Sequence, residues 1–211
     1  MKKLLAIILL MTSIGTANAT TLNFDDIYLN PDAPPPASSY APLAVGYGGF
    51  NWDNLYVFTK DSKSYADTGY ERGVVSGTNA VYNGFGMSAS MAGGLFDFMG
   101  ASFTAARIDG LTLDIKGLKA GQILYDRTIT LTTESPAHFD LEFLGIDTLS
   151  FDSGNLPRHQ FVMDDFTFTK QGTSPNGTGA IPVVPVPEPG SFLLVGAGLV
   201  GLLMSRRHRV K

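Results

Sequence analysis

Hydrophobic and polar residues alternate along much of the middle of the chain. The clearest alternating sets are Leu111, Leu113 and Ile115; Ile129 and Leu131; Phe139, Leu141 and Phe143; and Phe166 and Phe168. Because successive side chains of a strand point to opposite faces, this period of two predicts strands that bury one face. Short apolar runs at 55–58, 74–75, 80–82 and 96–98 predict further strands. No helical period is visible before the C-terminal tail.

Turn residues separate these predicted strands. Asp109-Gly110, Ala120-Gly121 and Ser153-Gly154-Asn155 stand between them, and the proline-rich stretch 30–42 excludes a helix or a central strand there. Many short antiparallel strands at this spacing predict an all-β fold, an antiparallel β-sandwich of the jelly-roll type. An up-and-down barrel is the alternative.

The chain opens with a pattern that is typical of export. Lys2 and Lys3 precede an apolar run at 4–14, and Ala17-Asn18-Ala19 follows with the small residues of a cleavage site at Ala17 and Ala19. Residues 1–19 are therefore predicted to be a signal peptide. Residues 20–170 then have the length of one ordinary domain.

The C-terminal part changes character after the domain. Residues 171–186 are rich in Gly, Pro, Ser and Thr and predict a linker. Residues 191–204 form a short apolar segment, predicted to be a transmembrane helix, and basic residues follow it. The positive-inside rule places the basic end in the cytoplasm and the domain outside.

The order of these tail features resembles the PEP-CTERM sorting signal of Gram-negative bacteria. The matching residues are Pro187, Glu188 and Pro189, then the short Gly-rich apolar segment, then Arg206 and Arg207. The resemblance implies anchoring in the inner membrane, recognition and processing by an exosortase, and delivery to the cell surface or extracellular matrix. It also implies an association with exopolysaccharide and biofilm. A plain tail anchor is the alternative.

The predicted domain is acidic and has no cysteine. Residues 20–170 hold nine Lys or Arg against eighteen Asp or Glu, a net charge of −9. This charge disfavours nucleic acid and anionic lipid as partners, and also acidic polymers unless cations bridge them. The absence of cysteine excludes disulfides, thiol catalysis and thiolate metal sites.

Two pairs of carboxylates stand on the first and last predicted strands, which often lie side by side in a jelly roll. Asp25 and Asp26 would then approach Asp164 and Asp165, and their charges would repel unless a cation lay between them. Calcium, with six to eight oxygen ligands and loose geometry, suits such a site. The alternative is that all four are solvated strand-end and turn residues.

The domain also resembles jelly-roll carbohydrate-binding modules. The resemblance is carried by Phe24-Asp25-Asp26, by the Tyr-Gly-Gly-Phe-Asn-Trp segment at 47–52, and by the closing strand at 160–168. It implies a structural calcium ion at the seam of the first and last strands.

An aromatic cluster within this region is a candidate glycan-binding platform. It comprises Tyr47, Trp52, Asp53 and Tyr56, because sugar rings stack on aromatic planes while Asp binds their hydroxyls. The alternative is that Trp52 belongs to the core. An extracellular polysaccharide is the expected ligand.

A non-enzymatic role is expected, because the chain has no nucleophile elbow, zincin helix, phosphate loop or histidine-metal spacing. A secreted glycan-active hydrolase that uses a pair of carboxylates is one alternative. A purely structural matrix protein without a ligand is the other.

Overall fold

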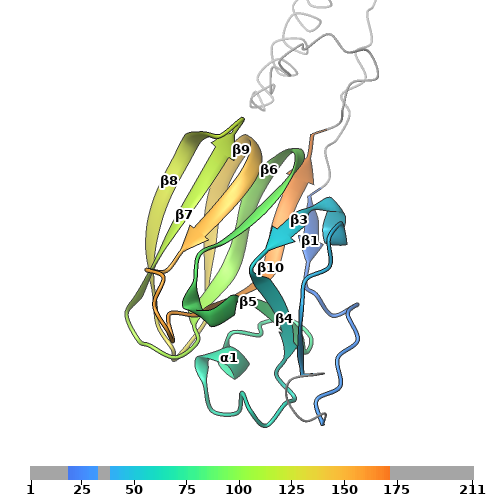
Figure 1. Ribbon diagram of the computed structural model, residues 1–211, viewed down its shortest axis with the longest axis vertical. Coiled ribbons are helices and arrows are strands. Elements are labelled where there is room, and N and C mark those ends of the chain that lie inside the picture. Colours follow the sequence, from blue (N-terminus) through green and yellow to red (C-terminus); the bar gives the residue numbers. More distant parts are fainter. Residues whose placement is uncertain (1–18, 33–38, 172–211) are drawn as a thin grey trace, which may run out of the picture. The chain divides into compact units, whose positions relative to one another are not determined.

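The computed structural model describes residues 19–32 and 39–171 (Figure 1). The predicted signal sequence before Ala19, the linker beyond Gln171, the transmembrane helix and the basic end lie outside these residues. Within the described part, no helix is long and apolar enough to cross a membrane.

The described residues form ten strands. These are β1 (Thr20–Leu22), β2 (Tyr40–Pro42), β3 (Asn51–Asp53), β4 (Leu55–Thr59), β5 (Asn79–Asn83), β6 (Ala89–Ala105), β7 (Leu111–Lys119), β8 (Gln122–Leu131), β9 (Ala137–Asp152) and β10 (Phe161–Lys170). The short helical elements are η1 (Tyr47–Gly49), α1 (Gly69–Arg72) and η2 (Gly84–Gly86).

All strand pairs are antiparallel, and the strand order is β2-β4-β5-β10-β6-β9-β7-β8. The strand β1 adds to β10, and β3 adds to β6. Only Asn54, with φ of 54°, separates β3 from β4, so the path β4-β5-β10-β6-β3 returns to the chain segment where it began. The predicted antiparallel β-sandwich of jelly-roll type is confirmed, and its layers share strands (Figure 1).

The core follows the alternation seen in the sequence. Leu111, Leu113 and Ile115 on β7 are buried, and Phe166 and Phe168 on β10 join them. Burial of this apolar surface is the main stabilising term of the domain. The predicted strand at 74–75 is wrong, because these residues follow α1 in an irregular segment that lies against β10.

A second, smaller cluster lies on the opposite face of the sheet formed by β2, β4, β5 and β10. Alternation along β4 sends Leu55 and Val57 into the main core, whereas Phe58 packs in the second cluster. The segment between β4 and β5, which contains α1, covers this face with Tyr65, Tyr70 and Val74.

Candidate functional site

The two acidic pairs do converge, because β1 lies beside β10 with Thr20 opposite Phe168. Asp25 and Asp26 follow β1, and Asp164 and Asp165 are part of β10. Asp25 of the first pair and both carboxylates of the second contact one segment, residues 75–79, which leads into β5. We call this arrangement the acidic seam.

Asp164 is fully buried within the acidic seam. Its Oδ2 accepts hydrogen bonds from the backbone N–H groups of Val75 (2.8 Å) and Ser76 (3.0 Å), and its Oδ1 accepts one from Asp165 N (2.7 Å). Burial raises the pKa of the Asp164 carboxyl to about 6, and the charge of Asp165 adds to the rise. The N–H donors act in the opposite direction.

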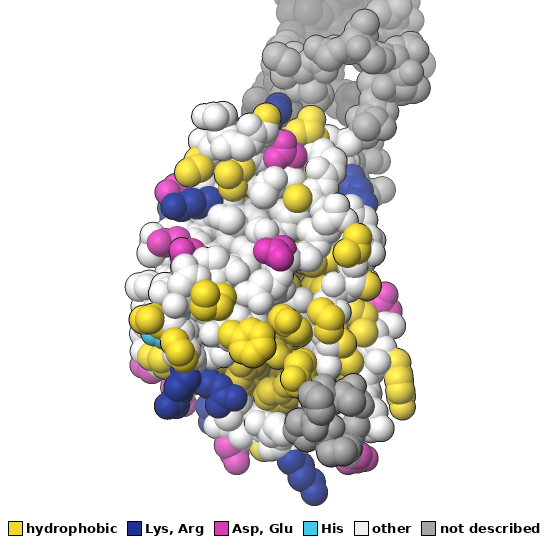
Figure 2. All heavy atoms as spheres, viewed as in Figure 1, with side chains coloured by type: hydrophobic (Ala, Val, Ile, Leu, Met, Phe, Trp, Pro, Cys, Tyr) yellow, Lys and Arg dark blue, Asp and Glu magenta, His cyan; other side chains and the backbone are white. Residues whose placement is uncertain are grey.

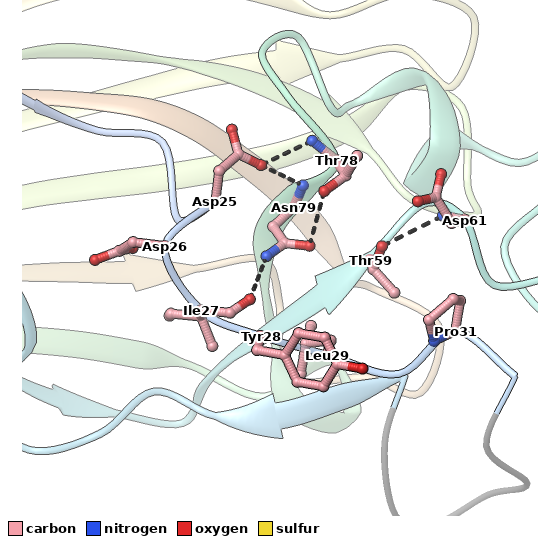
Figure 3. A pocket seen from close by; sticks show the side chains of 10 residues that line it. All are labelled: Asp25, Asp26, Ile27, Tyr28, Leu29, Pro31, Thr59, Asp61, Thr78 and Asn79. Carbon is pink, nitrogen blue, oxygen red and sulfur yellow. Dashed lines mark hydrogen bonds between the residues drawn. The ribbon is translucent and has the colours of Figure 1, made fainter.

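Asp25 binds the other half of the same segment. Its Oδ1 accepts hydrogen bonds from the N–H groups of Thr78 (2.7 Å) and Asn79 (3.0 Å), as Figure 3 shows. Between the two carboxylates, Gly77 has φ of +52°, and a Cβ at this position would overlap the Asp25 carboxylate. Lys60 Nζ donates to the Gly77 carbonyl (2.6 Å). The N–H groups of residues 75–79 therefore donate to a carboxylate on each side of Gly77, to Asp164 on one side and to Asp25 on the other.

These contacts do not fit the predicted calcium ion. Asp26 accepts from the Tyr47 hydroxyl (2.7 Å), and Asp165 accepts from Ser76 Oγ (2.7 Å). Calcium needs six to eight oxygens directed at one point, whereas at least one oxygen of each seam carboxylate accepts a hydrogen bond, and the donors come from different groups. Within residues 19–32 and 39–171, no group of three or more His, Asp or Glu side chains is placed to hold a metal.

A polar pocket of about 220 Å³ opens beside the Asp25 end of the seam. Its lining, drawn in Figure 3, comprises Asp25, Asp26, Ile27, Tyr28, Leu29, Pro31, Thr59, Asp61, Thr78 and Asn79. The Asn79 amide donates to the carbonyls of Phe24 (3.0 Å) and Ile27 (2.8 Å), which fixes the pocket wall. These hydrogen bonds therefore join residues 24–27, which follow β1, to residues 78–79 at the start of β5.

The predicted glycan platform is not assembled as expected. Trp52 is only 8% exposed, and its Nε1 donates to the Tyr47 carbonyl (2.9 Å). Its ring packs edge-on against Phe50 and Phe166 at centroid distances of 5.8 Å. Trp52 is thus a core residue, which was the alternative considered for it.

The other three platform residues lie in different surroundings. Tyr47 stacks on Phe24 at 5.9 Å, and burial together with the Asp26 carboxylate raises its pKa. Asp53 is exposed on β3. Tyr56 stands on β4, where the strand alternation directs its ring away from the main core.

Tyr56 belongs to an aromatic array that the sequence analysis did not identify. Its ring stacks on Tyr82 of β5 at 5.7 Å with an interplanar angle of 29°, and Tyr40 of β2 approaches edge-on at 6.2 Å. All three rings are partly exposed. Within the described residues, none of the three hydroxyls takes part in a hydrogen bond to a protein group.

The array continues onto the segment between β4 and β5. Tyr70 approaches Tyr82 edge-on at 5.4 Å, and Tyr65 lies 4.9 Å from Tyr70. We call these five residues, Tyr40, Tyr56, Tyr65, Tyr70 and Tyr82, the tyrosine face. Figure 2 shows hydrophobic side chains gathered over the region where Figure 1 places β4 and β5.

The hydroxyl ends of the tyrosine face lie close enough to affect one another. Burial raises the pKa of Tyr82, and the neighbouring tyrosines raise it further. Burial also raises the pKa of Tyr70 to about 12, although the positive charge of Arg107 lowers it. Tyr70 and Tyr82 therefore stay neutral at physiological pH.

Phe85 extends the face at one end. It is 76% exposed, lies 6.4 Å from Tyr56, and has φ of +57° within η2. A bulky residue is rarely found in this left-handed conformation, and such strain is concentrated at functional sites. The alternation along β4 and β5 could have indicated Tyr56 and Tyr82, whereas nothing in the sequence places Tyr65 and Tyr70 beside them.

The predicted sorting and cleavage residues are outside this geometry. Ala17, Pro187, Glu188, Pro189, Arg206 and Arg207 lie outside the described residues, and Ala19 is the first residue described.

Comparisons with known proteins give a match to a sorting motif and likenesses to solved structures, two of which are described here. The Stig cyclase Fisc from Fischerella sp. TAU is 11% identical, with a TM-score of 0.39 over 74% of this chain and 100% of that chain. The CBM22-1–GH10 modules of Clostridium thermocellum xylanase 10B, complexed with xylohexaose, are 14% identical. Their TM-score is 0.30 over 62% of this chain and 28% of that chain.

No curated protein matches the chain. Residues 185–207 match the PEP-CTERM protein-sorting motif. The chain therefore carries a PEP-CTERM sorting motif at its C-terminal end, which implies export, a membrane-anchored sorting signal and processing by an exosortase.

Proposed function

We propose that the exported domain is a non-enzymatic glycan-binding module of the cell surface or extracellular matrix, associated with exopolysaccharide and biofilm. The sorting motif supports the extracellular setting, in which polysaccharide is an abundant partner. The tyrosine face supports the binding activity.

One observation carries this proposal, the stacked pair of Tyr56 and Tyr82 on a partly exposed sheet face. Sugar rings present apolar C–H faces that pack on aromatic planes, and phenolic hydroxyls bond to sugar hydroxyls. Tyr40 and Phe85 extend the array beyond the pair, because each ring lies within 6.4 Å of Tyr56. Such an array binds an extended polymer through several weak contacts.

The contacts of the acidic seam favour binding over hydrolysis. A glycosidase needs two carboxyl groups that are free to reach the scissile bond. Asp25 and Asp164 are instead engaged by the backbone N–H groups of residues 75–79. A hydrolase is the competing function. Turnover of polysaccharide that is lost when one acidic pair is mutated would support it.

Binding of the full chain, purified in mild detergent, to the producing organism's exopolysaccharide tests the proposal. We expect saturable binding by the wild type. The affinity should fall roughly 3- to 10-fold in Tyr56→Leu, and by a similar factor in Tyr82→Leu, because each variant loses an aromatic ring on which a sugar can stack. Tyr125→Leu is the matched control, since Tyr125 stacks on Phe143 at the β8 end of the sheet.

A parallel measurement in EDTA, followed by addition of calcium, examines the cation. Binding that persists in EDTA agrees with a seam whose carboxylates are bound by N–H groups rather than by a calcium ion. Absence of binding under every condition overturns the glycan proposal and leaves the structural matrix role. Release of shorter saccharides during incubation points to the hydrolase.

A further inference from the structure

The margin of the tyrosine face carries an exposed cation in a domain that is otherwise acidic. The Arg107 guanidinium lies over the Tyr70 ring, 5.2 Å from its centroid. The residue is exposed, and its positive charge acts on the hydroxyls of both Tyr65 and Tyr70. Stacking on an aromatic ring orients a guanidinium while leaving its N–H groups available.

No carboxylate neutralises this guanidinium within the described residues. The ion pairs there join Lys116 to Asp126 and His138 to Asp140, and none includes Arg107. Asp109, two residues after Arg107, and Glu71, the residue after Tyr70, accept hydrogen bonds from backbone groups instead. Asp109 accepts from Thr133 N (3.1 Å), and Glu71 accepts from Asp67 N (2.7 Å).

A second arginine reaches the same margin from α1. A Cβ on Gly69 of α1 would overlap the Ala105 carbonyl, so α1 packs directly against the residues that precede Arg107. Arg72 ends α1 and donates to the Thr133 carbonyl (3.3 Å). Figure 2 shows basic side chains gathered beside the hydrophobic area, near the place of α1 in Figure 1.

We propose that the tyrosine face binds a carboxylated polysaccharide, a polyuronate, with the Arg107 guanidinium paired to a sugar carboxylate while neighbouring rings stack on Tyr56 and Tyr82. The planar fork of arginine matches a carboxylate in bidentate geometry. Exposed charges are screened within about 8 Å at physiological ionic strength, so acids that lie farther than this from Arg107 repel a bound carboxylate only weakly. This inference rests on the proposed glycan-binding function and names its ligand class.

The test compares polyuronates with their own carboxyl-reduced forms, which keep the chain and lose the charge. We expect the full chain in detergent to bind at least one of polygalacturonate, polyglucuronate and alginate about tenfold more tightly than the reduced polymer. Arg107→Gln should abolish that preference while leaving affinity for the reduced polymer unchanged. Arg107→Lys keeps the charge but not the fork, and should restore part of the preference.

Arg127→Gln is the control. Arg127 is exposed on β8, and its replacement changes the net charge of the domain by the same amount as Arg107→Gln. An unaltered melting temperature verifies that Arg107→Gln is folded. Equal affinity of the wild type for acidic and reduced polymers, with sensitivity to Tyr56→Leu, overturns the polyuronate inference and keeps glycan binding. Failure to bind any polymer, including the producer's own, overturns both.

Discussion

The acidic seam and the tyrosine face both involve the connection between β4 and β5, yet they use their side chains in opposite ways. In the seam, Asp164 and Asp25 direct their oxygens at the N–H groups of residues 75–79. On the face, Tyr56 and Tyr82 leave part of each ring exposed. The type of a residue therefore indicates which interactions it can make. Its partners in the folded protein decide whether these interactions are already made within the protein or remain available to a ligand.

The largest effect should come from removing the buried carboxylate of the seam. Asp164→Ala leaves three backbone N–H groups without an acceptor, and we expect it to lower the free energy of unfolding by about 2–4 kcal/mol. Urea unfolding followed by the fluorescence of Trp52, the single tryptophan, measures this loss. Asp165→Asn is the control and should cost under about 1 kcal/mol. Equal costs would contradict the assignment of Asp164 as the central acceptor.

The pH dependence of stability should isolate the charge of Asp164 from its hydrogen bonds. Its folded pKa of about 6 exceeds the ordinary value of 3.8, so at intermediate pH the folded state holds a proton that the unfolded chain has lost. The resulting stabilisation is complete below the ordinary value and is lost as the pH rises through 6. Relative to Asp164→Asn, the wild type should lose about 3 kcal/mol over this interval. A constant difference between the two would show that the pKa is not raised.

The smallest effect on stability is expected at Phe85, on the tyrosine face. Asn tolerates the left-handed conformation of this position, so Phe85→Asn should leave the unfolding free energy unchanged or raise it by up to about 1 kcal/mol. Glycan affinity should fall several-fold, because the exposed ring is lost. Unchanged affinity would limit the binding surface to the tyrosines.

The sequence predicted the strands whose two faces meet different surroundings. Leu111, Leu113 and Ile115 alternate with polar residues because β7 buries one face only. The 17-residue strand β6 was largely missed, since its Ala, Gly and Ser residues carry no alternation. The tail motif was predictable because it is read from consecutive residues.

The candidate sites depended on partners that local patterns do not reveal. The approach of Asp25 and Asp164 followed from the pairing of first and last strands, but their N–H donors come from an irregular segment without a signature. Trp52 and Tyr56 are only four positions apart in the sequence. The bend at Asn54, between β3 and β4, places Trp52 in the core and Tyr56 at the surface.

The pairing of β1 with β10 also fixes when the domain can finish folding. The N-terminal strand emerges first during synthesis, but its hydrogen-bonding partner is the last strand of the domain. Contacts between such distant segments form slowly, because the ends of a long loop must first meet. The domain can therefore be completed only once residues 161–170 are available, shortly before the sorting motif in the order of the chain.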